Sequence, residues 1–173
     1  MCRNVADFME WAYIYRMQGE PSSKITQVQQ ARHLIREAHS AALSTLMPDN
    51  AGPYGSLVIC ATFPDGAPML LLSSLAVHTA NLMRDPRACL LFDATDAQAD
   101  PLAGARLSLI GRITRAPELE LCRTRFLGRH PSAAAYASFD DFRFYRMQPD
   151  RAHLVAGFGQ IHWIEAPDLL HLP

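Results

Sequence analysis

Hydroxyl-bearing residues and a histidine gather where a predicted strand gives way to a predicted helix. Ser73 and Ser74 end an apolar run, and His78 and Thr79 fall in the first turn of a helix expected over residues 77–84. The opening turn of a helix has unpaired backbone N–H groups and the positive end of the helix dipole, so it favours a phosphate. The hydroxyls add donors, and His78 could add a charged one. This pattern predicts a phosphate cradle for a mononucleotide cofactor, although Ser and Thr also cap helices that bind nothing.

The elements that would position these residues follow from the periodicity of apolar side chains. Besides the helix above, helices are expected over residues 5–17, 26–39 and 118–127 and, Ala-rich and short, after Pro131; Thr26 and Gln29 form a plausible capping box for the second. Strands are expected over residues 41–47, 54–63, 68–73, 87–93, 106–114, 142–147 and 153–158, the last two broken at Pro149-Asp150. Six or seven short strands with tight turns favour a small antiparallel barrel with helices packed outside it.

Composition and charge exclude several classes of protein. The chain has 173 residues, 49% of them hydrophobic and 19% charged, which fits one globular domain. The formal net charge of -1 argues against a broad nucleic-acid surface or a polybasic membrane surface. No stretch has the roughly 20 apolar residues that span a bilayer. Lys24 is the only lysine among 16 basic residues, an arginine bias that genomic composition explains as well as function does.

The four cysteines, Cys2, Cys60, Cys89 and Cys122, form no close pair and no Cys-x-x-Cys motif. Cys60 and Cys89 lie in apolar runs, where a free cysteine behaves as a small buried hydrophobe. Neither a disulfide framework nor a zinc site is expected. Acidic residues interrupt the first 20 positions, so no signal peptide is expected either. We predict a soluble cytoplasmic protein without a metal site.

Seven short segments, taken in order, resemble the pyridoxamine 5'-phosphate oxidase-like family of FMN-binding split barrels, and more closely its haem-utilisation (HugZ-like) branch. The segments are residues 31–38, 53–58 (PYGSLV), 72–82 (LSSLAVHTANL), 100–107, 130–136, 141–143 and 157–159. The resemblance implies a mainly β (α+β) fold, a six- to seven-stranded antiparallel split β-barrel with peripheral helices. That domain would occupy residues 26–173, behind an N-terminal helical extension of residues 1–25. The resemblance also implies a homodimer with FMN at the subunit interface.

The resemblance assigns cofactor contacts by position. The strand end and helix start at 73–79 would hold the FMN phosphate, with His78 and Thr79 where relatives often carry an Arg-Lys pair. Residues 56–58 match the strand that borders the flavin, with Ser56 where many relatives have Arg. Arg106 matches a Gln near the isoalloxazine ring and would reach it across the dimer. The candidate cofactor-binding residues are Ser56, Leu57, Val58, Ser73, Ser74, His78, Thr79 and Arg106.

Two departures from the family shape the expected function. The C-terminal segment lacks the Arg-x-His motif with which the true oxidases grip pyridoxal phosphate. In the haem-degrading relatives the iron-ligating His lies in a further C-terminal domain, and the late histidines here, His153, His162 and His171, have no spacing that marks a ligand. The leading prediction is an FMN-dependent oxidoreductase with an unidentified small-molecule substrate. The alternatives are a haem-binding or haem-degrading protein on the same split-barrel dimer, and a non-catalytic flavin sensor.

Aromatic and basic residues alternate near residue 144, a pattern that some barrels use to bind nucleic acid. Phe142, Phe144 and Tyr145 alternate there with Arg143 and Arg146. With a net charge of -1, strand packing explains them better. We therefore expect neither a nucleic-acid partner nor a membrane partner.

Overall fold

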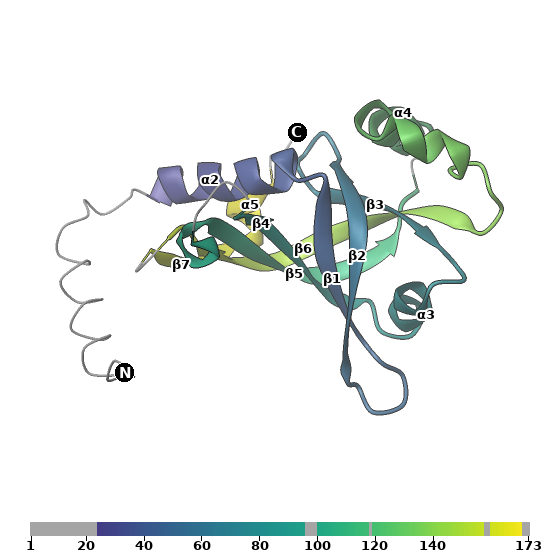
Figure 1. Cartoon of the computed structure of the whole chain (residues 1–173), viewed down its shortest axis with the longest axis horizontal. Helices are drawn as coiled ribbons and strands as arrows, with labels where there is room; N and C mark the ends of the chain where they lie inside the picture. The colour runs from purple at the N-terminus through teal and green to yellow at the C-terminus, as the bar shows by residue number, and fades with distance from the viewer. Residues whose placement is uncertain (1–23, 96–99, 118, 158–159, 171–173) are drawn as a thin grey trace.

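A computed structural model of the chain describes residues 24–95, 100–117, 119–157 and 160–170 (Figure 1). Its strands are β1 (Ser40–Leu46), β2 (Pro53–Thr62), β3 (Pro68–Ser73), β4 (Arg87–Ala94), β5 (Ala105–Arg115), β6 (Phe142–Val155) and β7 (Ile161–Glu165). Its helices are α2 (Lys24–Glu37), α3 (Val77–Arg84), α4 (Leu119–Arg129) and α5 (Ala166–Leu169), with 3-10 turns η1 (Pro101–Ala103) and η2 (Pro131–Ala135). The helix expected over residues 5–17 lies outside the described residues.

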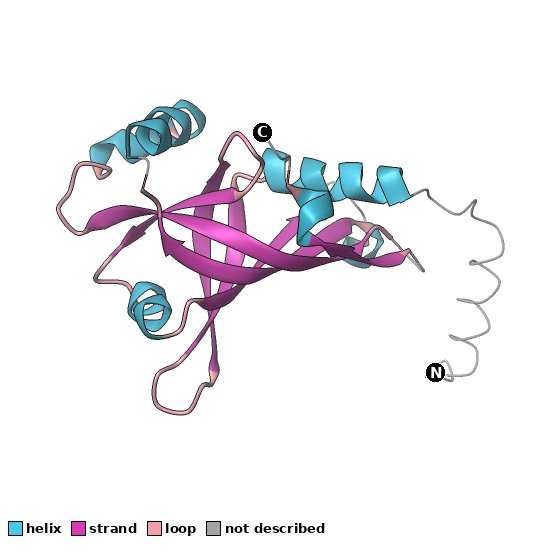
Figure 2. Ribbon diagram, turned by 180° about the vertical axis from the view of Figure 1, so that it is seen from behind, coloured by secondary structure: helices cyan, strands magenta, loops and turns pink. Residues whose placement is uncertain are grey.

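The strands form a closed antiparallel barrel. Their order is β3-β2-β1-β4-β5-β6, and pairing of β3 with β6 closes the ring. β7 adds a further strand to β6. The first half of β6 pairs with β3 and the second half with β7, while β5 runs along almost its whole length. The helices lie outside the barrel, as Figures 1 and 2 show. The predicted mainly β split barrel with peripheral helices is confirmed.

The sequence reading of the last strands was wrong. It placed a break at Pro149-Asp150, whereas the structure has one 14-residue strand, β6. Gly111 pairs with Pro149 and Ile110 with Arg151, so Asp150 is the extra residue of a β-bulge. A bulge tolerates proline because the ladder is already interrupted there. A Cβ at Gly111 would lie 2.9 Å from Pro149 Cα, so this close approach of two strands requires glycine.

The other predicted elements lie within two residues of the observed ones, except at the chain's end. The strand β7 and the helix α5 were not predicted. The capping box was also misplaced, because α2 begins at Lys24 and Thr26 lies inside it. None of the helices in the described part of the chain has the length and apolarity of a membrane-spanning segment.

Two apolar clusters hold the fold together. One fills the barrel and extends beneath α2, whose buried side chains are Ala31, Leu34 and Ile35. The other lies between α4 with η2 and the outer side of β2, β3 and β6, where Phe126 contacts Phe144 with ring centroids 5.6 Å apart. These two clusters place α2 and α4 on different parts of the barrel surface (Figure 1).

The chain's described ends are joined by hydrogen bonds from α2 to α5. Arg32 Nε donates to the carbonyl of Leu169 at 3.0 Å, and an Arg32 Nη donates to that of Asp168 at 2.8 Å. Lys24 Nζ lies 2.8 Å from the Asp168 carboxylate. The first and last described helices therefore pack as a pair on the barrel (Figure 2).

Candidate functional site

Ser56 and His78, 22 positions apart in the chain, meet in the structure. Ser56 Oγ lies 3.1 Å from His78 Nδ1, where β2 passes the first turn of α3. Burial lowers the pKa of His78 below its ordinary value of 6.5. The imidazole is therefore neutral at pH 7 and offers a hydrogen bond rather than the positive charge considered from the sequence. We call Ser56 and the first turn of α3 the α3 cradle.

The serines at the end of β3 are engaged within the protein. Ser73 Oγ donates to a carboxylate oxygen of Asp141 at 2.5 Å and accepts from the N–H of Leu75 at 3.1 Å. The N–H of Ser74 donates to the Asp141 carbonyl at 2.7 Å. Asp141 places a negative charge beside the expected phosphate position, a contact that the sequence did not predict. The capacity of Ser73 to donate to a phosphate is thus used by its own chain.

Thr79 is the polar group of the α3 cradle whose hydrogen bonding is incomplete. Its side chain is 2% exposed, and its Oγ1 has no hydrogen-bond partner within the described residues. A buried hydroxyl without a partner costs about 1–3 kcal/mol. Ala76 precedes the helix and provides no side-chain cap. Within the described residues the first turn of α3 therefore has one buried hydroxyl without a partner, at a helix end where an anionic group would be stabilised.

Three other predicted cofactor-binding residues lie apart from His78 and Thr79. Leu57 is 76% exposed on the outer face of β2, and Val58 is buried inside the barrel. Arg106 is the second residue of β5 and donates to the carbonyls of Leu102 at 2.9 Å and Gly104 at 3.2 Å. Of residues 56–58, the structure thus brings Ser56 into contact with the first turn of α3.

The position of α3 explains why Arg106 is distant from the α3 cradle within one chain. The buried amide of Asn81 donates to Thr45 Oγ1 at 2.9 Å and contacts Met47 Sδ at 3.6 Å, which ties α3 to the end of β1. Arg106 pairs with Asp93, at the end of β4 that lies beside the start of β1. A contact of Arg106 with a flavin in the α3 cradle therefore remains a prediction that depends on a second copy.

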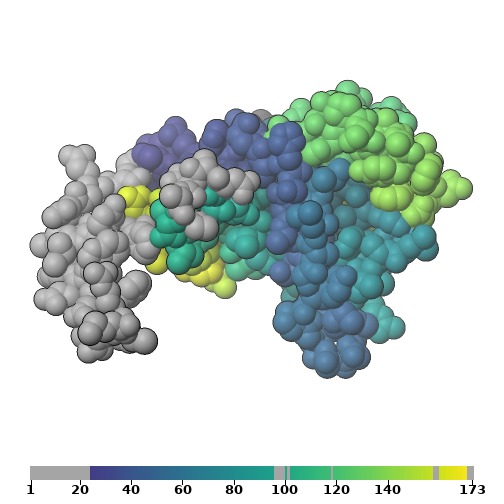
Figure 3. Space-filling model, in the orientation of Figure 1, coloured from purple at the N-terminus to yellow at the C-terminus, as the bar shows by residue number. Residues whose placement is uncertain are grey.

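A second candidate site, not predicted from the sequence, is a hollow on the outer face of the sheet. It has a volume of about 540 Å³, is mostly apolar, and takes residues from β1, β2, β4, β5, β6 and β7. The β1–β2 hairpin stands out from the body of the molecule beside these strands (Figure 3). Strand pairing sets its floor: Ser44, Cys89 and Ile110 lie opposite one another, and Ser108, His153 and Trp163 form the adjacent row.

Stacked side chains form one wall of this outer hollow. The rings of His153 and Trp163 have centroids 4.6 Å apart and are tilted by 33°. The Arg151 guanidinium lies over the same indole, 4.6 Å from its centroid. Trp163 is nevertheless 54% exposed. An exposed indole beside a half-buried imidazole offers a flat surface on which a planar ligand can stack.

Charged and thiol groups complete the outer hollow. Arg87 lies in its lining and donates to Asp85, with a closest contact of 2.5 Å. Those hydrogen bonds hold the pKa of Asp85 at about 2. Burial raises the pKa of the Cys89 thiol, which is therefore protonated at pH 7. The outer hollow thus combines an imidazole, a guanidinium, an aromatic platform and a neutral thiol, which suits a flat apolar molecule with acidic groups.

Comparison with known proteins identifies the family of the chain and several relatives. Residues 22–171 match the family model described as CREG, beta-barrel. The chain is 33% identical over 141 residues to the chloroplastic heme oxygenase HOZ of Arabidopsis thaliana, a match that covers 80% of this chain and 43% of the plant protein. A heme binding protein from Mycobacterium smegmatis shares 30% identity and superposes with a TM-score of 0.77, over 87% of this chain and 61% of that one.

A more distant structure identifies the fold. A protein of the pyridoxinephosphate oxidase family from Clostridium acetobutylicum, only 13% identical, superposes with a TM-score of 0.65 over 85% of this chain and 99% of that one. The resemblance to the pyridoxamine 5'-phosphate oxidase-like split barrels is therefore confirmed for the fold. The chain spans less than half the length of the plant relative and less than two thirds of the mycobacterial one.

Proposed function

The chain belongs to the CREG β-barrel family, and from that premise we propose that it is a haem-binding protein of haem iron utilisation. Two relatives that share at least 30% identity with it are a heme oxygenase and a heme binding protein. This support favours haem, which the sequence reading held as the alternative, over the flavin oxidoreductase that it preferred. Haem degradation would be a separate, further proposal, because the match covers only 43% of the plant oxygenase.

The observation that carries this proposal is the outer hollow around His153. Haem iron is commonly held by a histidine nitrogen, and drug-sized and cofactor ligands occupy mostly apolar pockets of roughly 300–1,000 Å³. The outer hollow has a histidine, His153, in its lining, and it is mostly apolar with a volume of about 540 Å³. His153 would hold the iron, Trp163 would contact the porphyrin beside it, and Arg87, which also donates to Asp85, would pair with a propionate. Bound haem would supply an iron centre whose reactivity depends on its axial ligand and surroundings.

We further propose that the protein is a homodimer that uses the same face of the sheet. Leu57, Leu91, Ile161 and Trp163 are large apolar side chains exposed on that outer face. One row of paired residues crosses six strands, with Leu57 of β2 at one end and Trp163 of β7 at the other. A contiguous apolar surface of this kind is typical of an interaction site, and a twofold dimer covers it with an identical surface. The ligand would then lie between two copies.

Haem titration of two histidine variants tests the proposal. Purified protein should bind haem with a shifted Soret band and quenched Trp163 fluorescence. His153→Ala should lose the shift, because His153 lies in the outer hollow. His162→Ala is the matched control, since His162 pairs with the fully buried Leu154 on the opposite face of the sheet and should leave the spectrum unchanged. No Soret shift with wild-type protein, or equal spectra for both variants, would contradict the proposal.

FMN remains a second candidate ligand because of the α3 cradle. Among the described residues Thr79 Oγ1 has no hydrogen-bond partner, and the neighbouring His78 of the same helical turn contacts Ser56 of β2. A phosphate at this helix start would satisfy those donors, and the flavin would make the protein an oxidoreductase or a flavin sensor. Thr79→Val should then weaken FMN binding without unfolding the protein. A colourless protein that takes up no FMN at micromolar concentrations would exclude this candidate.

We propose a cytoplasmic location from the state of the cysteines. Cys60 and Cys89 are free thiols in the part of the chain that the structure describes, and burial raises the pKa of Cys60 to about 12. Thiols that form no disulfide are typical of reducing compartments. Alkylation of the denatured protein without reductant should label both. Oxidised cysteines in protein taken from cells would argue for another compartment.

A further inference from the structure

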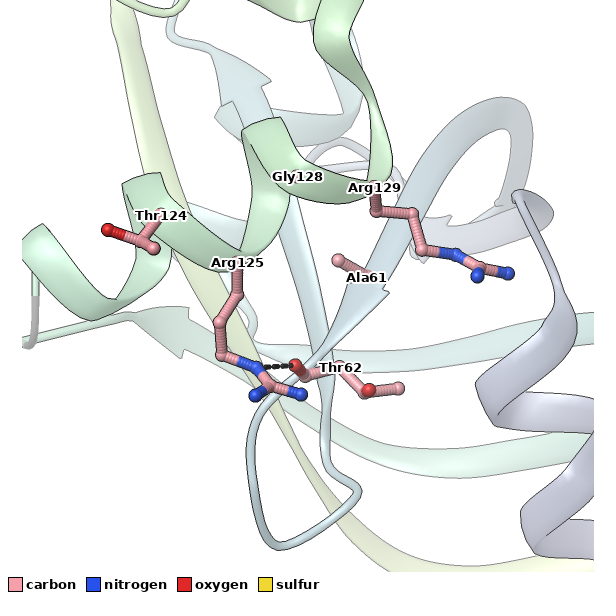
Figure 4. A pocket seen from close by; sticks show the side chains of 6 residues that line it. All are labelled: Ala61, Thr62, Thr124, Arg125, Gly128 and Arg129. Carbon is pink, nitrogen blue, oxygen red and sulfur yellow. Dashed lines mark hydrogen bonds between the residues drawn. The ribbon is translucent and has the colours of Figure 1, made fainter.

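A groove between α4 and the end of β2 shares no residue with the outer hollow. Its volume is about 280 Å³, and its lining residues are Ala61, Thr62, Thr124, Arg125, Gly128 and Arg129. Figure 4 shows that Arg125 and Arg129 leave α4 on either side of Ala61, while Thr124 points away from them. We call this feature the α4 groove.

The two guanidinium groups of the α4 groove form no ion pair with the carboxylates of the described residues. Arg125 Nε donates to the Thr62 carbonyl at 2.8 Å (Figure 4), and Arg129 donates to the carbonyl of Glu37 at the end of α2. Within the described residues the ion pairs involve Lys24, Arg87 and Arg146 only. Both charges in the groove are therefore held by neutral backbone acceptors.

One donor of the α4 groove has no acceptor at all. Arg129 Nε is buried and lacks a hydrogen-bond partner in the part of the chain that the structure describes. A buried, charged N–H group without an acceptor is costly, so native proteins nearly always supply one. Gly128 leaves open space in the groove, because a Cβ built there would meet no atom within 4 Å. Arg129 Nε has no access to that space in its present orientation, so an acceptor in the groove reaches it only when the side chain turns.

From this geometry we infer that the α4 groove binds a phosphate-type oxyanion. The planar fork of a guanidinium matches tetrahedral and carboxylate oxyanions, and charge-assisted hydrogen bonds of this kind are among the strongest in proteins. An oxyanion between Arg125 and Arg129 would draw the Arg129 side chain toward the groove, accept from its Nε and neutralise both charges. The groove also has space for the organic part of a small phosphate monoester.

Phosphate titration followed on the arginine side chains tests this inference. The Nε–Hε NMR signals of Arg125 and Arg129 should shift saturably with inorganic phosphate at constant ionic strength. Glycerol phosphate in a parallel titration reports on monoesters, and acetate reports on carboxylates. The inference requires tighter binding of a phosphate than of acetate. Shifts that grow linearly without saturation, or no shift, would overturn it.

A space-filling variant separates the groove from general charge effects. Gly128→Leu should abolish the saturable shift, because Gly128 is an exposed residue of the groove lining and a Cβ there meets no atom within 4 Å, which leaves space for a longer side chain to cover the groove. Arg125→Gln should weaken phosphate binding by about tenfold, as expected for one charged hydrogen bond. Arg123→Gln, on the same helix but outside the groove lining, removes the same charge and should not change the affinity. Equal effects of the Arg125 and Arg123 variants would overturn the inference.

Discussion

Buried polar side chains decide stability at the scale of single residues, because each needs a partner inside the protein. Asn81 is 1% exposed and supplies the donor for the buried hydroxyl of Thr45. Asn81→Ala should lower the free energy of unfolding by about 2–3 kcal/mol, since it creates a cavity and leaves Thr45 without that donor. Urea denaturation measures this change.

An exposed asparagine provides the control for that measurement. Asn50 Oδ1 accepts only from the N–H of Gly52 in an exposed turn, so Asn50→Ala should cost less than about 1 kcal/mol. If Asn81→Ala lowers the free energy of unfolding by no more than Asn50→Ala does, the Asn81–Thr45 hydrogen bond does not anchor α3.

His78 should make stability depend on pH. Its pKa in the folded protein lies below the ordinary 6.5, so below about pH 6.5 the unfolded chain binds more protons than the folded one. The free energy of unfolding should therefore fall as the pH is lowered from 7 toward 5, by an amount set by at most about one proton. In His78→Gln this part of the slope should vanish. Parallel denaturation curves of both proteins across the range would refute the assignment to His78.

At the scale of elements, the bulge in β6 depends on a glycine in β5. A Cβ at Gly111 would lie 2.9 Å from Pro149 Cα. Gly111→Ala should destabilise the protein by about 1–3 kcal/mol, the range for forced overpacking. Gly55→Ala in β2 is the matched control, because its Cβ would meet no atom within 4 Å. Thermal denaturation of both variants compares them, and equal melting temperatures would contradict the requirement for glycine.

Local sequence patterns were sufficient for most elements but not for those set by distant partners. The helix over 77–84 and the strand over 68–73 were predicted with the observed bounds, because their turn and proline signals lie next to them in the chain. Pro149 was taken as a strand break, since nothing nearby in the sequence shows that Gly111 makes room for a bulge. β7 was not predicted, because a strand of five residues shows too short an alternation of apolar and polar side chains.

The same distinction separates the two candidate sites. The residues of the α3 cradle adjoin in sequence, apart from Ser56, and the family resemblance identified them. Each strand of the outer hollow supplies only one to three residues, and those strands span the chain from β1 to β7. Their meeting follows from strand order and register, which are tertiary information. Thus the sequence named His153 only as one of three late histidines with no spacing that marks a ligand, and it did not show that Trp163 and Arg87 accompany it.

For the whole molecule, the exposed apolar sheet face predicts assembly. Leu57→Glu should shift the protein from dimer to monomer, because a carboxylate at a 76% exposed position on that face would be buried in the dimer. Leu119→Glu, on α4 and 60% exposed, introduces the same charge away from the sheet and should remain dimeric. Sedimentation velocity measures both masses. A monomeric wild-type protein, or a dimeric Leu57→Glu, would contradict the proposed interface.

The pairing of α2 with α5 has a consequence for synthesis of the protein on the ribosome. Arg32 binds carbonyls that lie 136 and 137 positions later in the chain, and barrel closure likewise waits for β6. Such long-range contacts make folding slow. The barrel must therefore remain open until β6 emerges, and nascent chains arrested before β6 should be cut readily by protease. During that interval the cell must keep the growing chain from aggregating, a task for chaperones rather than for the barrel itself.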